Sequence, residues 1–541
     1  MGWAMTWAVL CGSPHCRHRH RRRTVTMPHP PPTQIHLSKS RLSDRGIAAQ
    51  WAPARLSIAL PPHGFNRRCP TWRETSLSHH LLDLPAQERH KTTKETSMAN
   101  TFEFIGSTSG EHYIAKQRIA QGGQGAVYRV KAKSDSRPYA VKWYHANSAS
   151  DNQRRQLETL VSHGAPRCDE EGIDFVWPIE MVHFDESSSY GYVMPLYDAD
   201  RYVHYNKVIN GKVTQPRRDT LAQMSYRVCM ALEAVHRSGL VYCDINLGNI
   251  QFDTKQGTLI VCDNDNVVVN NSDASIAGVP EFMAPEVALG QSKPNAQTDL
   301  YSLAVLLYQV WTWEHPMEGA QTALVRSWDQ PAKLQYYARD PLFAHHPTDQ
   351  RNSAAGDPML TYSLRRWNEI CPTVLKEVFI RTFTDGVHNP DRRTRLSEWQ
   401  RYFMEIEANA SRCPECSAVN ILDPDQPGQL CYHCCTPQTS QLVLKCSYRG
   451  GGSNLMVYSG APLRRHHVEP RAIGEQALET LGRVEDHPHQ PGAHILRNFS
   501  DHAWVYDLGE ERFRIEPGQA RALSPNGKIM VADATMQIAA I

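Results

Sequence analysis

The 541-residue sequence has no long apolar run and almost no net charge. No run of about 18 uncharged apolar residues occurs, so we expect no membrane-spanning helix and no membrane partner. The formal net charge at pH 7 is only +2, which does not favour nucleic acid as a partner. The charge is uneven, however. Residues 1–97 contain 15 Lys and Arg against 5 Asp and Glu, and the remainder is mildly acidic.

Residues 1–97 also lack any sustained helical or strand period. Stretches such as "CRHRHRRR" and "PHPPPTQ" are basic and proline-rich, a composition typical of segments that do not fold. In "MGWAMTWAVLCG" the charges follow the apolar residues, the reverse of a secretory signal. We interpret this region either as a disordered basic leader or as an extension upstream of the true start, for which Met98 is the natural alternative.

The cysteines do not form the pattern of a disulfide framework. Several stand singly in apolar segments, where reduced, buried thiols are the usual state: Cys168, Cys229, Cys243, Cys262 and Cys371. The others include a late cluster with metal-ligand spacing. This distribution predicts a reducing, cytoplasmic location.

From residue 112 the sequence alternates strand-like runs with turns. "YIAKQRIAQGGQGAVYRVKAK" predicts a hairpin whose Gly-rich turn allows backbone amides to approach phosphate oxygens. "RPYAVKWYH" follows as a strand carrying Lys142, which could reach an α- or β-phosphate. The helical pattern "SDNQRRQLETLVSHG" offers Glu158 as the carboxylate that pairs with Lys142.

The stretch "GLVYCDINLGNIQF" places Asp244 and Asn249 five positions apart, the spacing of the catalytic Asp and metal-binding Asn in protein kinases. With the Gly-rich turn, "AVK", "VCDND", "GVPEFMAPE" and "TDLYSLAVLLYQV" in the same order, residues 112–405 resemble the eukaryotic-type Ser/Thr protein kinase family. The resemblance implies an α+β, two-lobed fold in a domain of residues 98–405, with lobes at about 112–196 and 197–405.

The resemblance also implies the site and its cofactors. Asp244 would act as catalytic base, with Asn249 and Asp263 holding Mg²⁺ or Mn²⁺ and Asp265 a possible second carboxylate. Lys142 would contact the phosphates. The full expected set of ATP-binding residues is Ala120, Gly122, Gly125, Val127, Ala140, Lys142, Glu158, Met194 and Leu196.

Three departures from the family pattern stand in the catalytic loop. Tyr242 replaces His in a packing position, and Cys243 replaces the Arg that pairs with a phosphorylated activation loop. Asn246 replaces Lys, so a neutral amide is expected to donate to the transferring phosphoryl group, with slower chemistry. We expect an active protein kinase. An ATP-binding pseudokinase scaffold and a small-molecule phosphotransferase are the alternatives.

Two supporting contacts follow from the same resemblance. Glu286, which closes the activation segment, is expected to pair with a late arginine, Arg392 or Arg393. Asp299, at the head of an apolar helix, is expected to anchor the catalytic loop.

Residues 364–403 resemble more narrowly the bacterial kinases of tellurium-resistance-type gene clusters. That resemblance implies a protein substrate, and as partners a von Willebrand A-domain protein and a metal-dependent protein phosphatase.

"CPECSAVNILDPDQPGQLCYHCC" contains two C-x₂-C pairs separated by fourteen residues: Cys413, Cys416, Cys431 and Cys434. This spacing predicts a zinc ribbon over residues 410–438, with four thiolates around a structural Zn²⁺. His433 and Cys435 leave the identity of the fourth ligand open.

Residues 440–541 read as short strands separated by Gly, Pro and Asn turns, which predicts a small all-β domain, a sandwich or barrel. "LGRV…LRNFSDHAWVYDLG…NGKIMVA" is faintly similar to forkhead-associated phosphothreonine readers, with Arg483 and Ser500 in suggestive positions. A β-rich docking module without that specificity is the alternative.

Overall fold

The computed structural model describes residues 102–540, apart from gaps at 169, 185–186, 273–277, 357, 424–425, 427, 439–441, 449–450, 470 and 473. The predicted leader, residues 1–97, and Met98 lie outside the described residues. No helix in the described part of the chain is both long enough and apolar enough to cross a bilayer.

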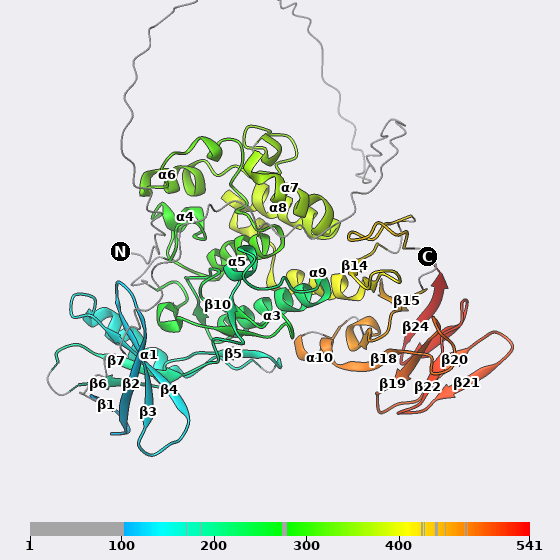
Figure 1. The fold of residues 1–541 in the computed structure, drawn as a ribbon, viewed down its shortest axis with the longest axis horizontal. Helices are drawn as coiled ribbons and strands as arrows, with labels where there is room; N and C mark the ends of the chain where they lie inside the picture. The colour runs from blue at the N-terminus through cyan, green and yellow to red at the C-terminus, as the bar shows by residue number, and fades with distance from the viewer. Residues whose placement is uncertain are drawn as a thin grey trace, which may run out of the picture. The chain divides into compact units, whose positions relative to one another are not determined.

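The first lobe is a closed barrel of six antiparallel strands in the order β1-β2-β3-β4-β7-β6 (Figure 1). Alternate residues of the strands point into a small apolar core that includes Phe104, Val141 and Val193. Helix α1 packs against β6. The elements are β1 (Glu103–Gly106), β2 (His112–Gln121), β3 (Gly125–Ala132), β4 (Pro138–Tyr144), α1 (Asp151–His163), β6 (Glu180–His183) and β7 (Gly191–Pro195).

Helices dominate the second lobe. Helix α5 begins at a capping box on Asn295 and is buried over almost its whole length, as its continuous apolar sequence requires. Its core is shared with α3, α8 and α9. The helices are α2 (Asn206–Ile209), α3 (Arg218–Arg237), α4 (Pro285–Ala288), α5 (Ala296–Thr312), α6 (Gln330–Leu334), α7 (Thr361–Arg365), α8 (Thr373–His388) and α9 (Leu396–Ala408).

Short strands and single helical turns complete this lobe. The strands are β5 (Ile173–Phe175), β8 (Val203–His204), β9 (Leu240–Val241), β10 (Ile250–Phe252), β11 (Leu259–Val261) and β12 (Val268–Val269). The turns are η1 (Asn264–Asn266), η2 (Thr322–Leu324), η3 (Gln335–Arg339), η4 (Ala354–Gly356), η5 (Pro358–Leu360), η6 (Arg366–Ile370) and η7 (Pro390–Arg392).

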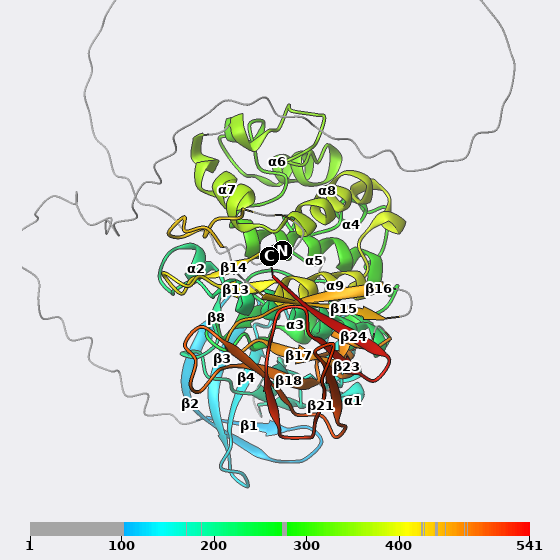
Figure 2. The same cartoon turned by 90° about the vertical axis from the view of Figure 1, so that its right-hand side faces the viewer.

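After α9 the chain forms a two-stranded antiparallel ribbon of β13 (Ala410–Arg412) and β14 (Val419–Ile421). The following β-rich region consists of two antiparallel sheets, β16-β15-β24-β23-β20-β21 and β17-β18-β19-β22, over one apolar core. The sequence predicted a small all-β domain, a sandwich or a barrel, and the described region is β-rich with one short helix, α10 (Gly474–Leu478). Strand β16 lies beside helix α9 (Figure 2).

The elements of the β-rich region are β15 (Leu442–Tyr448), β16 (Gly451–Met456), β17 (Pro462–Arg464), η8 (Arg465–His467), α10 (Gly474–Leu478), β18 (Thr480–Asp486), β19 (His494–Asn498), β20 (Trp504–Asp507), β21 (Arg512–Ile515), β22 (Ala520–Ala522), β23 (Lys528–Val531) and β24 (Ala534–Ala540).

Candidate active site

Two strand pairings bring together the segments that carry the predicted catalytic residues. Strand β9 pairs with β12, and β10 pairs with β11, so the loop between β9 and β10 lies against the loop between β11 and β12. Asp244 lies in the first loop and Asp263 in the second. The amide of Asn266, from the second loop, donates to Asp244 Oδ2 at 3.1 Å. The two loops therefore form one polar site.

The carboxylate of Asp244 is surrounded by amide donors. Asn249 Nδ2 donates to Oδ2 at 3.0 Å and Asn246 Nδ2 donates to Oδ1 at 3.0 Å, in addition to the bond from Asn266. Burial raises the pKa of Asp244, and these hydrogen bonds oppose that effect by stabilising the charged form. An oriented carboxylate with a raised pKa is suited to accept a proton.

Asn246, predicted to donate to the transferring phosphoryl group, makes its hydrogen bonds within the catalytic loop in this structure. Its Nδ2 donates to both the backbone oxygen and Oδ1 of Asp244, each at 3.0 Å, and its Oδ1 accepts from the backbone N–H groups of Gly248 and Asn249. An amide nitrogen has two hydrogens, and both have acceptors within Asp244. In this conformation Asn246 shapes the loop and orients Asp244, and its role at the phosphoryl group stays a prediction.

Asp299 anchors the catalytic loop, as predicted. Its carboxylate accepts from the backbone N–H groups of Tyr242 at 2.8 Å and Cys243 at 3.1 Å, and it pairs with His236 at 2.9 Å. Cys243 has a positive φ of 67°, a conformation that a non-glycine residue adopts only when its surroundings impose it. The Asp299 contacts hold this backbone in place immediately before Asp244. Tyr242 is buried and donates to the backbone oxygen of Cys262, as its packing role implied.

Lys142, on β4, points into the same site from the first lobe. Its Nζ lies 2.7 Å from Oδ2 of Asp265 and 3.5 Å from Oδ1 of Asp263. Burial by itself lowers the pKa of Lys142, and the two carboxylates reverse that effect and raise the pKa well above its usual value. Lys142 is therefore a charged, buried ammonium beside the predicted metal ligands.

The predicted pair between Lys142 and Glu158 is absent. The side chain of Glu158 is 52% exposed and pairs with Arg154 at 3.3 Å. The buried face of α1 carries Gln153, Leu157 and Leu160, whose spacing turns Glu158 toward solvent. The prediction was wrong because it chose the residue by its charge and ignored the rotation of the helix.

Gln156 was not among the site residues predicted from the sequence. Its Nε2 donates to the backbone oxygens of Asp265 and Val267, both at 3.0 Å, and so connects α1 to the segment around η1. A neutral glutamine gives little signal in a sequence. Its place on the buried side of α1, next to Leu157, was the available clue.

The Gly-rich turn joins β2 to β3, as predicted, but two of its glycines serve the barrel. The N–H of Gly122 donates to the oxygen of Gly125 at 2.8 Å, so in this conformation it closes the turn. A Cβ on Gly125 would lie 2.1 Å from the oxygen of Trp143 on β4, so glycine is required there for strand pairing. Ala120 is an exposed residue of β2.

The remaining predicted ATP-binding residues lie on adjacent barrel strands. Val127 pairs with Lys142 between β3 and β4, and Ala140 pairs with Met194 between β4 and β7. Ala140 is buried and Met194 is half-buried. Leu196 follows β7 and is also half-buried. The structure thus places Val127 opposite Lys142 and Met194 opposite Ala140, while Leu196 N–H bonds to the oxygen of Pro138 at the start of β4.

The residues predicted to hold magnesium fit that ion. Asp263 offers a carboxylate that is 54% exposed. Because Nδ2 of Asn249 donates to Asp244, Oδ1 of Asn249 is the amide atom that could bind a metal ion. Nearby, Oδ1 of Asp265 and Oδ1 of Asn266 are buried and have no hydrogen-bond partner among the described residues. Carboxylate and amide oxygens are the ligands that Mg²⁺ prefers in proteins.

Glu286 pairs with Arg393, one of the two arginines predicted. Nη1 and Nη2 of Arg393 donate to the two carboxylate oxygens, each at 2.8 Å, and the arginine side chain is fully buried. Arg392 is exposed. The bidentate pair ties the segment that closes the activation loop to the turn before α9.

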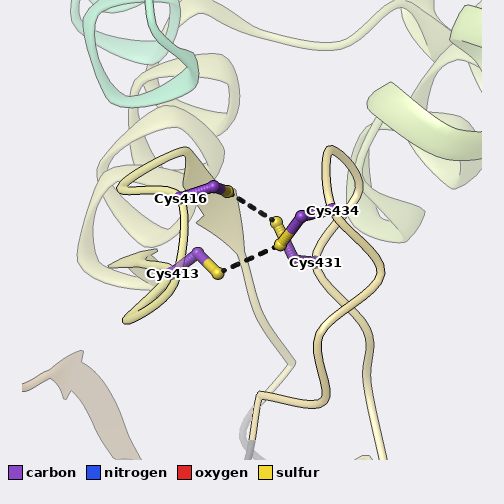
Figure 3. A group of neighbouring side chains, drawn as sticks. All are labelled: Cys413, Cys416, Cys431 and Cys434. Carbon is purple, nitrogen blue, oxygen red and sulfur yellow. Dashed lines mark hydrogen bonds between the residues drawn. The ribbon is translucent and has the colours of Figure 1, made fainter. Parts of the chain in front are cut away.

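A second polar site lies in the ribbon (Figure 3). The ligand atoms of Cys413, Cys416, Cys431 and Cys434 all lie within 4.8 Å of one another. Sγ of Cys413 is 3.5 Å from that of Cys434, and Sγ of Cys416 is 3.7 Å from that of Cys431. A tetrahedron of thiolates around a metal at about 2.3 Å has edges of about 3.8 Å. The group could therefore hold a metal ion.

The two cysteine knuckles have the same backbone geometry. Cys413 N–H donates to the oxygen of Ala418 at 2.9 Å, and Cys431 N–H donates to the oxygen of Thr436 at 2.9 Å. In each knuckle the residue after the second cysteine, Ser417 or Cys435, has a φ of 59°. His433 and Cys435 are not members of the four-cysteine group among the described residues.

A barrel lobe carrying a buried lysine, next to a helical lobe carrying an oriented aspartate and two metal-ligand candidates, defines a kinase-type site. The family profile described as protein kinase domain matches residues 113–397. The chain belongs to the protein kinase family.

Curated relatives cover the same region. The probable serine/threonine-protein kinase SCO3848 of Streptomyces coelicolor is 28% identical over 222 residues, which span 39% of this chain and 31% of the relative. The probable serine/threonine-protein kinase PknB of Bifidobacterium longum is 25% identical over 222 residues, with the same shares of 39% and 31%. The chain thus spans under a third of the length of these two relatives.

Among solved structures, one described as the ROP18 kinase domain in complex with AMP-PNP and sucrose aligns with a TM-score of 0.39 at 17% identity. The alignment covers 57% of this chain and 84% of the chain in that solved structure.

Proposed function

We propose that the protein is an active serine/threonine kinase that transfers the γ-phosphoryl group of ATP to a hydroxyl group of a protein substrate. The observation that carries the proposal is the environment of Asp244, whose carboxylate is oriented by three amide donors beside Asn249 and Asp263. Family membership and the names of the relatives support the same activity.

In the proposed reaction, Asp244 accepts the proton of the substrate hydroxyl as its oxygen bonds to the γ-phosphorus and the bond from that phosphorus to the bridging oxygen of ADP breaks. Asn249 and Asp263 would hold the magnesium ion, which neutralises developing charge on the phosphates when bound. Lys142 donates to the phosphate oxygens, and the rate then depends mainly on positioning and electrostatics.

Asn246 lacks the charge of the lysine found at this place in the family pattern. Because an amide is neutral, the transferring phosphoryl group has one fewer cationic donor, and in this structure the amide of Asn246 orients Asp244 instead. The base and both metal-ligand candidates are retained, so we propose slower phosphotransfer rather than none. Retention of these residues favours a kinase over a pseudokinase scaffold.

The test is transfer of ³²P from γ-labelled ATP with Mg²⁺ by the full chain, beside Asp244→Ala. Label on the chain itself or on a model protein such as casein, lost in Asp244→Ala, would support the proposal. Nucleotide binding without transfer would favour the scaffold. Label on an aminoglycoside but on no protein would favour a small-molecule phosphotransferase.

We further propose that the four-cysteine group holds a structural Zn²⁺. The edge lengths and the paired knuckles support this assignment, and four thiolate ligands would leave no open position for catalysis. Metal analysis of the purified chain by mass spectrometry tests it, since one zinc per chain is expected and another metal would contradict the assignment.

The β-rich region is proposed to be a docking module. Arg483 is exposed on β18 with its guanidinium 5.8 Å from the ring of Phe499, which is itself 47% exposed. Ser500 Oγ donates to Asn498 Oδ1 at 2.7 Å and accepts from Trp504 at 3.0 Å, so it is already held within the fold. Pull-down with phosphothreonine and unphosphorylated forms of one peptide would separate a phosphothreonine reader from a docking module of other specificity.

The narrower resemblance of residues 364–403 extends this proposal to partners and location. We propose that the kinase is of the bacterial tellurium-resistance-cluster type and acts in the cytoplasm beside a von Willebrand A-domain protein and a metal-dependent protein phosphatase. Reciprocal co-purification of the kinase with each partner class tests the proposal.

A further inference from the structure

The ammonium of Lys142 is held by a carboxylate from the segment after β11, and the carboxylates of α1 are turned away from it. Nζ lies 2.7 Å from Oδ2 of Asp265, and the two side chains are 7% and 0% exposed. A buried charge persists only with a partner of opposite charge or with metal. The Lys142–Asp265 contact is therefore the central ion pair of the site.

A second donor fixes Asp265 in this position. The hydroxyl of Tyr144, two residues after Lys142 on the same strand, donates to the same oxygen, Oδ2. Burial and the nearby Asp265 raise the pKa of Tyr144 well above its usual value, so the hydroxyl stays protonated and donates at all physiological pH values. One strand thus supplies both donors to one carboxylate oxygen.

Helix α1 contributes to this arrangement through an amide. Gln156 Nε2 donates to the backbone oxygen of Asp265 at 3.0 Å, which holds the segment that presents the carboxylate. The acidic residues of α1 are Asp151 and Glu158, and both are exposed. No carboxylate of α1 therefore faces Lys142.

We propose that Asp265 is the positioning residue for Lys142, and that it orients the ammonium toward the phosphates of ATP without help from Glu158. This inference rests on the proposed kinase function. An ammonium has three N–H donors, and the Asp265 bond uses one of them. The contact with Asp263 is long, at 3.5 Å, so donors remain for phosphate oxygens. The orientation of the lysine then depends on the segment after β11 and not on a charged contact with α1.

The rival role for Asp265 is that of a metal ligand. Its Oδ1 is buried and has no partner among the described residues, and a metal ion could use that oxygen. The two roles differ in a measurable way, since a metal ligand changes the Mg²⁺ requirement and a positioning residue changes nucleotide affinity and turnover at saturating Mg²⁺.

The test compares Asp265→Asn with Glu158→Gln, two changes that each replace a carboxylate by an amide of the same shape. For each full-length variant we would measure kcat and KM for ATP over a Mg²⁺ titration, and Kd for the fluorescent nucleotide mant-ATP. Asp265→Asn is expected to lower kcat/KM about 10²-fold, the loss typical of a misplaced reacting group, and to weaken mant-ATP binding. Glu158→Gln is expected to match the wild type.

Two results would overturn the inference. Equal losses in Glu158→Gln and Asp265→Asn would mean that the α1 carboxylate reaches Lys142 in the working enzyme. Recovery of Asp265→Asn activity by higher Mg²⁺ would make Asp265 a metal ligand.

If Asp265→Asn does not fold, as judged by circular dichroism, Tyr144→Phe replaces it, with Tyr139→Phe as control. Tyr139 lies on the same strand, but its hydroxyl donates to Asp135 and not to Asp265. Only Tyr144→Phe is expected to weaken mant-ATP binding, and equal binding in both would overturn the inference.

The mant-ATP measurement separates this inference from the proposed function. A wild-type chain that binds nucleotide but transfers no phosphate would refute the kinase proposal, and the affinity ratio of Asp265→Asn to Glu158→Gln would still decide the role of Asp265. A wild-type chain that binds no nucleotide would overturn both.

Discussion

The guanidinium carbon of Arg218 lies 3.7 Å from the centre of the Tyr432 ring. Arg218 is at the start of α3 in the helical lobe, and Tyr432 stands inside the second cysteine knuckle, so this cation–π contact joins the kinase core to the ribbon. Burial lowers the pKa of Arg218 to about 10, which leaves it charged at neutral pH. Its Nη2 also donates to the backbone oxygen of Glu369 at 3.0 Å.

Tyr432→Leu is expected to destabilise the kinase core by about 1–2 kcal/mol, because it removes a desolvated cation–π contact from a buried charge. Urea unfolding followed by tryptophan fluorescence measures the change. Tyr432→Phe keeps the ring and should be close to the wild type, and a loss in Tyr432→Phe as large as in Tyr432→Leu would show that the ring contact is not the cause.

Removal of the proposed zinc ion is expected to lower the thermal stability of the kinase domain as well as that of the ribbon. Without a metal ion the four cysteines take up protons and lose the bonds that hold the two knuckles together, and the second knuckle positions Tyr432. Cys416→Ser should lose the metal and lower the midpoint of thermal unfolding by several degrees. Cys168→Ser is the matched control outside the group, and it should keep one metal per chain. An unchanged unfolding midpoint in Cys416→Ser would contradict the coupling.

The acid limb of the kinase pH–rate profile should lie above the ordinary Asp pKa of 3.8. Burial raises the pKa of Asp244, and the base works only when ionised, so activity is lost as the pH falls through this raised pKa. The amide bonds lower the pKa, so Asn246→Ala, which removes one of them, should move the acid limb to higher pH. kcat/KM measured across pH tests this. A shift to lower pH would contradict the assignment of Asp244 as the base.

Arg393→Ala is expected to lower the free energy of unfolding by about 3–5 kcal/mol, because it leaves the carboxylate of Glu286 without its bidentate partner in a largely buried site. Arg392→Ala, at the exposed neighbouring position, should change stability little. Chemical unfolding of the two variants compares them directly. Similar losses in both would mean that the pair with Glu286 is not the source of the effect.

The sequence predicted the elements whose partners lie close together in the chain. Asn246 and Asn249 contact Asp244 from two and five residues away. The two cysteine knuckles follow from the C-x₂-C spacing and are closed by backbone hydrogen bonds over five residues. The family resemblance also implied the anchoring role of Asp299 and a pair between Glu286 and either Arg392 or Arg393, of which the structure has Arg393.

Only the tertiary structure decided what Lys142 contacts. Several carboxylates lay within reach in the sequence, and Glu158 was chosen because it stands on the expected helix. The rotation of α1 is set by the burial of Leu157 against barrel residues and of Leu160 in the core of the helical lobe, and this rotation sends Glu158 to solvent. The loop after β11 then brings Asp265 to the lysine. A spacing in sequence determines local geometry because few bonds separate the groups, whereas the partner of a buried charge depends on how whole elements pack.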